Sequence, residues 1–393
     1  EPGTPEALRL KDLMPRLQWP VDQLTGVGEP QSSHYVVGND GRPAPKSLVG
    51  VMGDGRLHHW GSISAISFSL DGLLIVTGGN DAAVRVWDAK TFRLQYTFYG
   101  HSGPVSEVAV SPDGKLVISV GRDHKAHVWQ LEGRTKRYTA KPLRTYEEHL
   151  APLHAVVFSP DGRQVATAGN DLVIRLWDPE TAETIKELKG HSAAVGALCF
   201  PSQDTLISAS DDRSVRWWDV GSGRPSDQVS TGYKVWELAI SPDKKWLAYG
   251  GEGENATLYD LENKVAKKID PRRKDEEFLR IGNVKGLAFN GASDLIYIAS
   301  RMAMVSYDLK QRRLDNFYAV GSVALAVDPS RETLASAPAV GSLSVWSLED
   351  KPRRLYGQTE FSGRFNDDHL KGTILRIGFH PNGHSLVAVS HAN

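Results

Sequence analysis

Four sets of residues in this chain combine the side chains of a hydrolase triad with a tryptophan. In each set the hydroxyl residue lies four positions before an aspartate, and that aspartate lies six positions before the tryptophan. The sets are His59, Thr77, Asp81 and Trp87; His101, Ser119, Asp123 and Trp129; His149, Thr167, Asp171 and Trp177; and His191, Ser208, Asp212 and Trp218. A histidine that takes a proton from a hydroxyl, while an aspartate orients its ring, is the arrangement that activates a serine nucleophile.

The repetition of the sets argues against that chemistry, because a nucleophile is needed only once. The same residue types also suit a buried hydrogen-bonded relay. In such a relay the aspartate accepts from the histidine ring, and the hydroxyl joins the histidine to the indole N–H, a donor that needs a partner when it is buried. A network of this kind stabilises a fold only when every member is satisfied. We therefore interpret all four sets as structural and expect no catalytic residue in the chain.

The segments around these sets predict short β-strands joined by tight turns. Each repeat begins with an apolar run, which is Ile63–Phe68 in the first repeat. A tight turn follows the run. In the second repeat this turn is Ser111–Gly114, in which proline presets φ and glycine accepts a positive φ. A second apolar run, a second turn at Gly79–Asp81 and a third run ending in Trp87-Asp88 complete the pattern, and a fourth run at Leu94–Phe98 leads to the next repeat. Each repeat thus predicts four strands. Sheets of this size bury both faces when they stack radially.

The repeats resemble those of the WD40 β-propeller family. The resemblance covers roughly residues 47–393, and its motifs are Gly100-His101, Gly190-His191, Trp87-Asp88, Trp177-Asp178 and Trp218-Asp219. It implies an all-β, WD40-type propeller of four-stranded blades in which the four sets form relays. The short uniform repeats with Ser-Pro-Asp-Gly turns look like the WD40 modules of bacterial multidomain proteins.

The aromatic anchors of the third strands predict the number of blades. Seven anchors are visible, and an eighth repeat begins at residue 373 and stops at Asn393; the anchors are Trp87, Trp129, Trp177, Trp218, Tyr259, Tyr307 and Trp346. We expect eight blades, with seven as the alternative, because a half-blade leaves an exposed strand edge. Strands at residues 48–52 and 34–38 are expected to complete the last blade; the alternative is a chain cut short. Residues 1–33 are interpreted as a linker or the tail of an upstream region, and residues 34–393 as the propeller.

The later repeats lack the relay, because Gly253, Arg301 and Val340 occupy the position of the aspartate. We expect these blades to be held by packing alone.

Composition and spacing exclude several classes of function. A net charge of −1 with 24% charged residues argues against nucleic-acid binding, which needs a basic surface. No apolar run approaches membrane-spanning length. The single cysteine, Cys199, lies in an apolar strand and is expected to be buried and inert. His124 and His127 lie three apart on a predicted strand and point to opposite faces. We expect no metal and no cofactor.

The fold favours a binding function. Propellers of this family mostly bind proteins or peptides through the loops of one rim. The family resemblance places on that rim the residue before each relay aspartate and a residue after each relay histidine, namely Trp60, Asn80, Pro104, Arg122, Leu150, Asn170, Ser192 and Asp211. We expect a monomeric, non-enzymatic scaffold that binds a protein or peptide as one module of a larger protein. The alternative is an enzyme or small-ligand binder with a site at the central channel, which Asp, Glu, His or Arg side chains converging there would favour.

Overall fold

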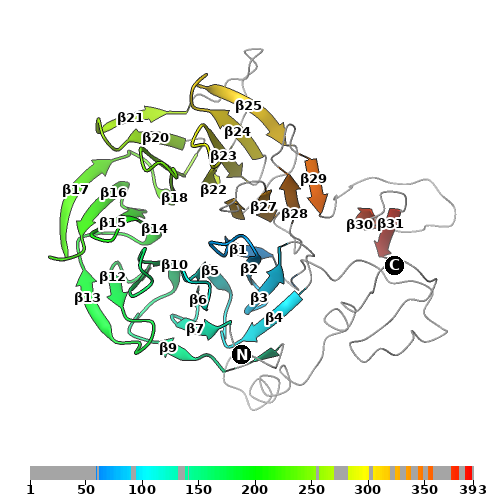
Figure 1. Cartoon of the computed structure of the whole chain (residues 1–393), viewed down its shortest axis with the longest axis horizontal. Helices are drawn as coiled ribbons and strands as arrows, with labels where there is room; N and C mark the ends of the chain where they lie inside the picture. The colour runs from blue at the N-terminus through cyan, green and yellow to red at the C-terminus, as the bar shows by residue number, and fades with distance from the viewer. Residues whose placement is uncertain are drawn as a thin grey trace.

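The ring of this protein is built from β-strands alone in the residues that the computed structural model describes (Figure 1). Those residues are 59, 62–89, 94–131, 138–139, 141–253, 256–269, 282–300, 304–318, 324–327, 333–337, 344–347, 353–356, 373–379 and 386–391. None of them forms a helix long and apolar enough to cross a membrane.

The first half of the ring follows the four relay repeats, with neighbouring strands antiparallel in chain order. The first sheet holds β1 (Ile63–Phe68), β2 (Leu74–Gly79), β3 (Ala83–Asp88) and β4 (Leu94–Tyr99), and the short β8 (Tyr138–Thr139) pairs parallel to β4. The next holds β5 (Val105–Val110), β6 (Leu116–Gly121), β7 (Ala126–Gln130) and β9 (Arg144–Tyr146). Two more hold β10 (Leu153–Phe158), β11 (Val165–Gly169), β12 (Ile174–Trp177) and β13 (Thr184–Leu188), and β14 (Val195–Ser202), β15 (Thr205–Ser210), β16 (Ser214–Asp219) and β17 (Arg224–Ser230).

The second half of the ring continues the same order without relays. Its sheets hold β18 (Val235–Ile240), β19 (Trp246–Gly251), β20 (Ala256–Asp260) and β21 (Val265–Lys268); β22 (Val284–Phe289), β23 (Leu295–Ser300), β24 (Met304–Asp308) and β25 (Arg313–Tyr318); and β26 (Ala324–Val327), β27 (Thr333–Ala337), β28 (Ser344–Ser347) and β29 (Arg353–Tyr356). A final pair, β30 (Thr373–Phe379) and β31 (Leu386–His391), hydrogen-bonds as a two-stranded hairpin.

The predicted number of blades is wrong. Six sheets have four strands, the β1 sheet has five and the β30–β31 hairpin has two, so neither eight nor seven four-stranded blades occur in the described part of the chain. The ring closes before the last repeat, because β26 and β27 lie against β1. Ala324 and Ala335 pack there on Ile63, Ile75 and Trp87, which leaves no open face for another blade. The N-terminal strands expected at residues 34–38 and 48–52, and the segment 1–33, lie outside the described residues.

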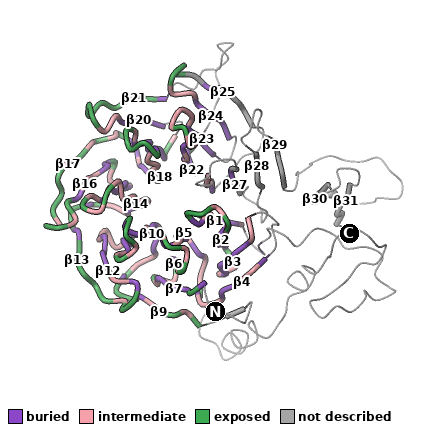
Figure 2. The backbone as a smooth tube through the Cα atoms, viewed as in Figure 1, coloured by how far each residue is buried: buried purple, intermediate pink, exposed green. Residues whose placement is uncertain are grey.

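Apolar clusters between neighbouring sheets hold the ring together. Strands at the periphery, such as β13, β17 and β21, are largely exposed, whereas the second and third strands are buried (Figure 2). Two of the relay tryptophans stack on an aromatic ring from the outer strand of the preceding sheet. Trp129 lies 4.9 Å from Phe98, and Trp177 lies 4.7 Å from Tyr146, both centroid to centroid and nearly parallel. Each blade therefore completes the core of its neighbour.

The innermost strands of six sheets share a β-bulge near their first residues. The pairing register shifts between the first and third residues of β1, β5, β10, β14, β18 and β22. Bulges re-aim the unpaired side chain. The unpaired residues are Ser64, Ser106, His154, Gly196, Trp236 and Lys285.

Candidate functional site

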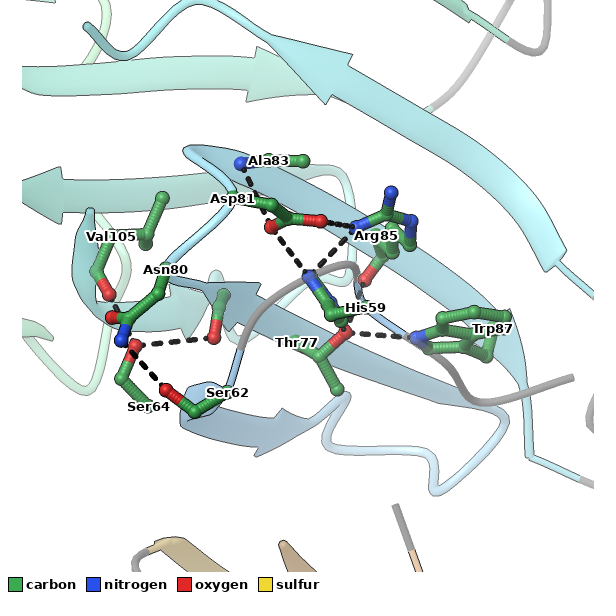
Figure 3. A network of polar contacts seen from close by, with 11 residues as sticks. His59, Ser62, Ser64, Thr77, Asn80, Asp81, Ala83, Arg85, Trp87 and Val105 are labelled. Carbon is green, nitrogen blue, oxygen red and sulfur yellow. Dashed lines mark hydrogen bonds and ion pairs between the residues drawn. The ribbon is translucent and has the colours of Figure 1, made fainter. Parts of the chain in front are cut away.

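The first of the four sets forms a continuous chain of hydrogen bonds (Figure 3). His59 Nδ1 lies 2.9 Å from an oxygen of Asp81, and its Nε2 lies 2.7 Å from Thr77 Oγ1. Trp87 Nε1 donates to the same hydroxyl at 2.9 Å. Thr77 on β2 pairs with Arg85 on β3, so Trp87 reaches the Thr77 hydroxyl from two residues further along β3, and the turn between the two strands holds Asp81 beside His59.

The other three sets repeat this geometry, with the corresponding contacts between 2.7 and 3.1 Å. The hydroxyl residues Thr77, Ser119, Thr167 and Ser208 are all 0% exposed. Each hydroxyl is held between an imidazole and an indole, so no substrate can reach it. The arrangement satisfies buried polar groups and positions no nucleophile.

Burial and neighbouring charges shift the pKa values of two relay residues, Asp171 and His59. Burial alone would raise the pKa of Asp171, but hydrogen bonding to His149 and the nearby Arg175 lower it to about 2. Burial, helped by Arg85, lowers the pKa of His59 to about 4. At neutral pH the carboxylate is therefore ionised and His59 is neutral.

A basic residue on the third strand is an additional partner that sequence reasoning missed. Arg85 Nη1 lies 2.7 Å from Asp81, Arg175 Nη1 lies 2.5 Å from Asp171, and Arg216 lies 3.7 Å from Asp212. The signal was readable, since each arginine follows its aspartate by four residues. The corresponding residue of the second repeat is His127.

The β18 sheet replaces the relay with tyrosines. Tyr233 follows a glycine as the relay histidines His101 and His191 do, and its hydroxyl is 2.9 Å from Thr257 Oγ1 in the interior. Tyr249 stands at the position of the relay hydroxyl, ten residues before Tyr259. This blade is therefore not held by packing alone. Gly253 adopts a positive φ of 73° in the turn, and Arg301 and Val340 lie outside the described residues.

The rim residues lie where the second strand of each relay sheet turns into the third. Asn80, Arg122 and Asn170 are exposed, and Asp211 is half-buried. Asn80 donates to Ser62 Oγ at 2.6 Å, and Asn170 lies 2.8 Å from His154 Nε2. Beside these turns the structure places Pro104, half-buried, Ser192, exposed, and Leu150, 83% exposed. Trp60 lies outside the described residues.

Asp211 belongs to a cluster that joins three successive sheets. Its carboxylate accepts from Trp236 Nε1 at 2.8 Å and pairs with Lys234 Nζ at 3.3 Å, both from the next sheet. Lys285, from the sheet beyond, places its ammonium 3.8 Å from the centroid of the Trp236 ring. We call Asp211, Lys234, Trp236 and Lys285 the Trp236 cluster. Sequence reasoning found only Asp211; the bulge position shared by Trp236 and Lys285 was the available signal.

Two glutamates of the innermost strands interact with each other, and one of them, Glu237, follows Trp236 in the chain and interacts with Lys285. Glu107 on β5 accepts from the Val156 backbone N–H at 3.0 Å. Burial raises the pKa of Glu107 to about 8. Burial and the charge of Glu107 raise the pKa of Glu237, on β18, to about 8, while Lys285 opposes the shift. The β5 and β18 sheets are not neighbours in the ring, so this interaction crosses its centre.

The titration of Glu107 yields a prediction. Between its ordinary pKa of 4.5 and the raised value of about 8, the folded chain holds a proton that the unfolded chain has released. Stability is therefore lost as pH rises through this window. In Glu107→Gln the amide oxygen still accepts from Val156 but cannot ionise. We expect melting temperatures that match wild type near pH 4.5 and a variant more stable by about 1–3 kcal/mol above pH 8. A difference that does not grow with pH would contradict the assignment.

Four segments of the chain match the family model described as WD domain, G-beta repeat. The matched residues are 55–88, 92–130, 140–178 and 182–219, which are the four relay repeats.

Of three relatives found by sequence comparison, one is named as a subunit of a complex and one as a WD repeat-containing protein. THO complex subunit 3 of Arabidopsis thaliana is 28% identical over 42% of this chain and 51% of its own length. WD repeat-containing protein AAC3 of Dictyostelium discoideum is 26% identical over 43% of this chain and 36% of its own length. The periodic tryptophan protein 2 homolog of Mus musculus is 35% identical over 53% of this chain and 22% of its own length. The chain thus spans about half or less of the length of these relatives. All three are eukaryotic, so the resemblance to bacterial multidomain proteins is not supported.

Proposed function

We propose, from the four segments that match the family model described as WD domain, G-beta repeat, that this chain is a non-enzymatic scaffold, and that it binds a protein or peptide on the rim that carries the Trp236 cluster. The single observation that carries this proposal is the cluster itself. It combines a half-buried tryptophan with one carboxylate and two ammonium groups drawn from three sheets. Tryptophans held by neighbouring groups are the side chains that contribute most to protein interfaces.

The relays support the absence of catalysis. Their hydroxyls are fully buried, and their histidines are already engaged on both ring nitrogens. The residues that differ from repeat to repeat lie on the turns and at the bulges, where a rigid ring presents them to a partner.

The setting of the ring is part of the proposal. The relatives are longer than the segments that match, and one is named as the subunit of a complex. We propose that this chain acts as a monomeric ring within a larger protein or assembly. Rim residues outside the cluster, such as Arg122 and Asn170, would then adjust which partner is accepted.

A small ligand at the centre of the ring is the second candidate function. It is favoured by Glu107 and Glu237, which interact across the centre and hold protons at neutral pH. A neutral carboxyl group is a hydrogen-bond donor that a polar ligand could use. The two candidates separate experimentally, because Glu107→Gln should leave protein binding on the rim unchanged.

Trp236→Ala tests the rim. Partners captured by the full chain from a cell extract should bind this variant at least about 30-fold more weakly, as expected for an interface hot spot. Leu150→Ala is the matched control, since Leu150 is an exposed apolar residue of the rim outside the cluster. The measurement is quantitative recovery on immobilised protein, followed by titration of each recovered partner. If every partner binds Trp236→Ala and Leu150→Ala equally well, the Trp236 cluster is not the binding site.

A further inference from the structure

The second relay repeat differs from the other three in the basic residue on its third strand. Arg85, Arg175 and Arg216 approach the relay aspartate in three repeats, and His127 stands at this position in the second. The ring of His127 lies 4.4 Å from that of His101, centroid to centroid. The substitution therefore brings a second imidazole to the relay instead of a guanidinium.

Three groups able to bind a metal ion meet at this place. His101 Nδ1 lies 3.0 Å from both oxygens of Asp123, and ligand atoms of His101, Asp123 and His127 all lie within 4.8 Å of one another. His127 is 4% exposed, and in the described part of the chain its Nε2 has no hydrogen-bond partner. A buried nitrogen without a partner is costly, and Nε2 would gain one by binding a metal ion.

The local charge also favours a cation. The Asp123 carboxylate, whose counterparts in the other three repeats have an arginine guanidinium beside them, faces the imidazoles of His101 and His127 instead. Lys125, the nearest lysine along the chain, pairs with Glu147 at 2.5 Å.

We propose that His101 Nδ1, the Asp123 carboxylate and His127 Nε2 bind a divalent transition-metal ion such as Zn²⁺, which takes the place of the arginine guanidinium. Two imidazole nitrogens and one carboxylate oxygen are a ligand set that zinc accepts, with a fourth position left for water. Sequence reasoning expected no metal because it paired His127 with His124; folding pairs His127 with His101 instead.

The surroundings orient both imidazoles for this role. His127 Nδ1 lies 3.0 Å from Thr145 Oγ1, and donation to that hydroxyl leaves the lone pair on Nε2. His101 binds through Nδ1 once its proton has moved to Nε2, which lies 2.7 Å from Ser119 Oγ. Ligand atoms of a tetrahedral zinc site lie about 3.3 Å apart, so small rotations of the two rings complete the geometry.

Titration of the full chain with Zn²⁺ against a chromophoric chelator tests the proposal. Wild type should bind one equivalent tightly, and His127→Arg, which restores the arginine of the other three repeats, should bind at least about tenfold more weakly. Saturating Zn²⁺ should raise the melting temperature of wild type but not that of His127→Arg, and Mg²⁺ and Ca²⁺ should have no such effect. Equal zinc affinity in both proteins, or a melting temperature that Zn²⁺ leaves unchanged, would overturn the proposal.

Two further variants keep the test decisive if His127→Arg folds poorly. Thr145→Val removes the group that orients His127 and should weaken zinc binding about tenfold without touching a ligand. Arg85→His should create a second site with His59 and Asp81. Thr97 lies opposite Arg85 on the neighbouring strand, as Thr145 lies opposite His127. The Thr97 hydroxyl has no hydrogen-bond partner in the described residues, so it can orient the new histidine. Unchanged affinity in the first variant, or a stoichiometry that stays at one in the second, would count against this ligand set.

Discussion

Replacing Thr167 with valine should lower the free energy of unfolding by about 2–4 kcal/mol, because two buried polar groups lose their partner at once. Thr167 is 0% exposed and holds Trp177 Nε1 at 3.1 Å and His149 Nε2 at 2.8 Å. Valine has the shape of threonine, so the loss reports on hydrogen bonding and not on a cavity. Urea unfolding followed by tryptophan fluorescence measures it.

Thr167→Ser is the control for this prediction. Serine performs the same task at Ser119 and Ser208, so this variant should lose less than about 1 kcal/mol, mainly from the missing methyl group. If the valine and serine variants were equally stable, the relay would contribute nothing beyond packing. A hydrolase triad built on Thr167 is already excluded by the burial of its hydroxyl.

Trp177→Ala should destabilise the ring by about 3–5 kcal/mol. Trp177 is 0% exposed and stacks on Tyr146 with ring planes 5° apart, so alanine leaves a cavity between two sheets. Trp177→Phe keeps an aromatic ring against Tyr146 and loses only the indole N–H and some volume, and Thr167 can still donate to His149. Thermal unfolding should therefore rank wild type above phenylalanine and phenylalanine above alanine. Equal losses in the two variants would show that stacking between the sheets is unimportant.

The four relay sheets and the β18 sheet are held by different kinds of hydrogen bond. In the first four sheets a buried carboxylate, imidazole, hydroxyl and indole tie the second and third strands to the segment that enters the blade. In the β18 sheet Tyr233 and Thr257 make a neutral link at the corresponding place. Relay sheets should therefore lose stability in acid as Asp123 and Asp171 take up protons near pH 2, whereas the link between Tyr233 and Thr257 contains no group that gains a proton in this range.

The sequence by itself determined the content of each blade. Strands, turns and relay partners are set by contacts within about forty residues, and the positions of His101, Ser119 and Asp123 along the chain already imply their meeting once strands pair. Turn residues and alternating apolar runs act locally, so they can be recognised one repeat at a time.

Only the tertiary structure decided how many blades form the ring and what meets at its centre. The ring closes where Ala324 packs on Ile63. The number of sheets needed to reach that point depends on the angle between each sheet and the next, and no local sequence pattern encodes the total of these angles. Glu107 and Glu237 come from sheets that are not neighbours, and the Trp236 cluster is drawn from three sheets. His127 meets His101 through the folding of one blade, although its neighbour in sequence is His124. The ring thus brings together side chains whose separation along the chain carries no information about their distance in space.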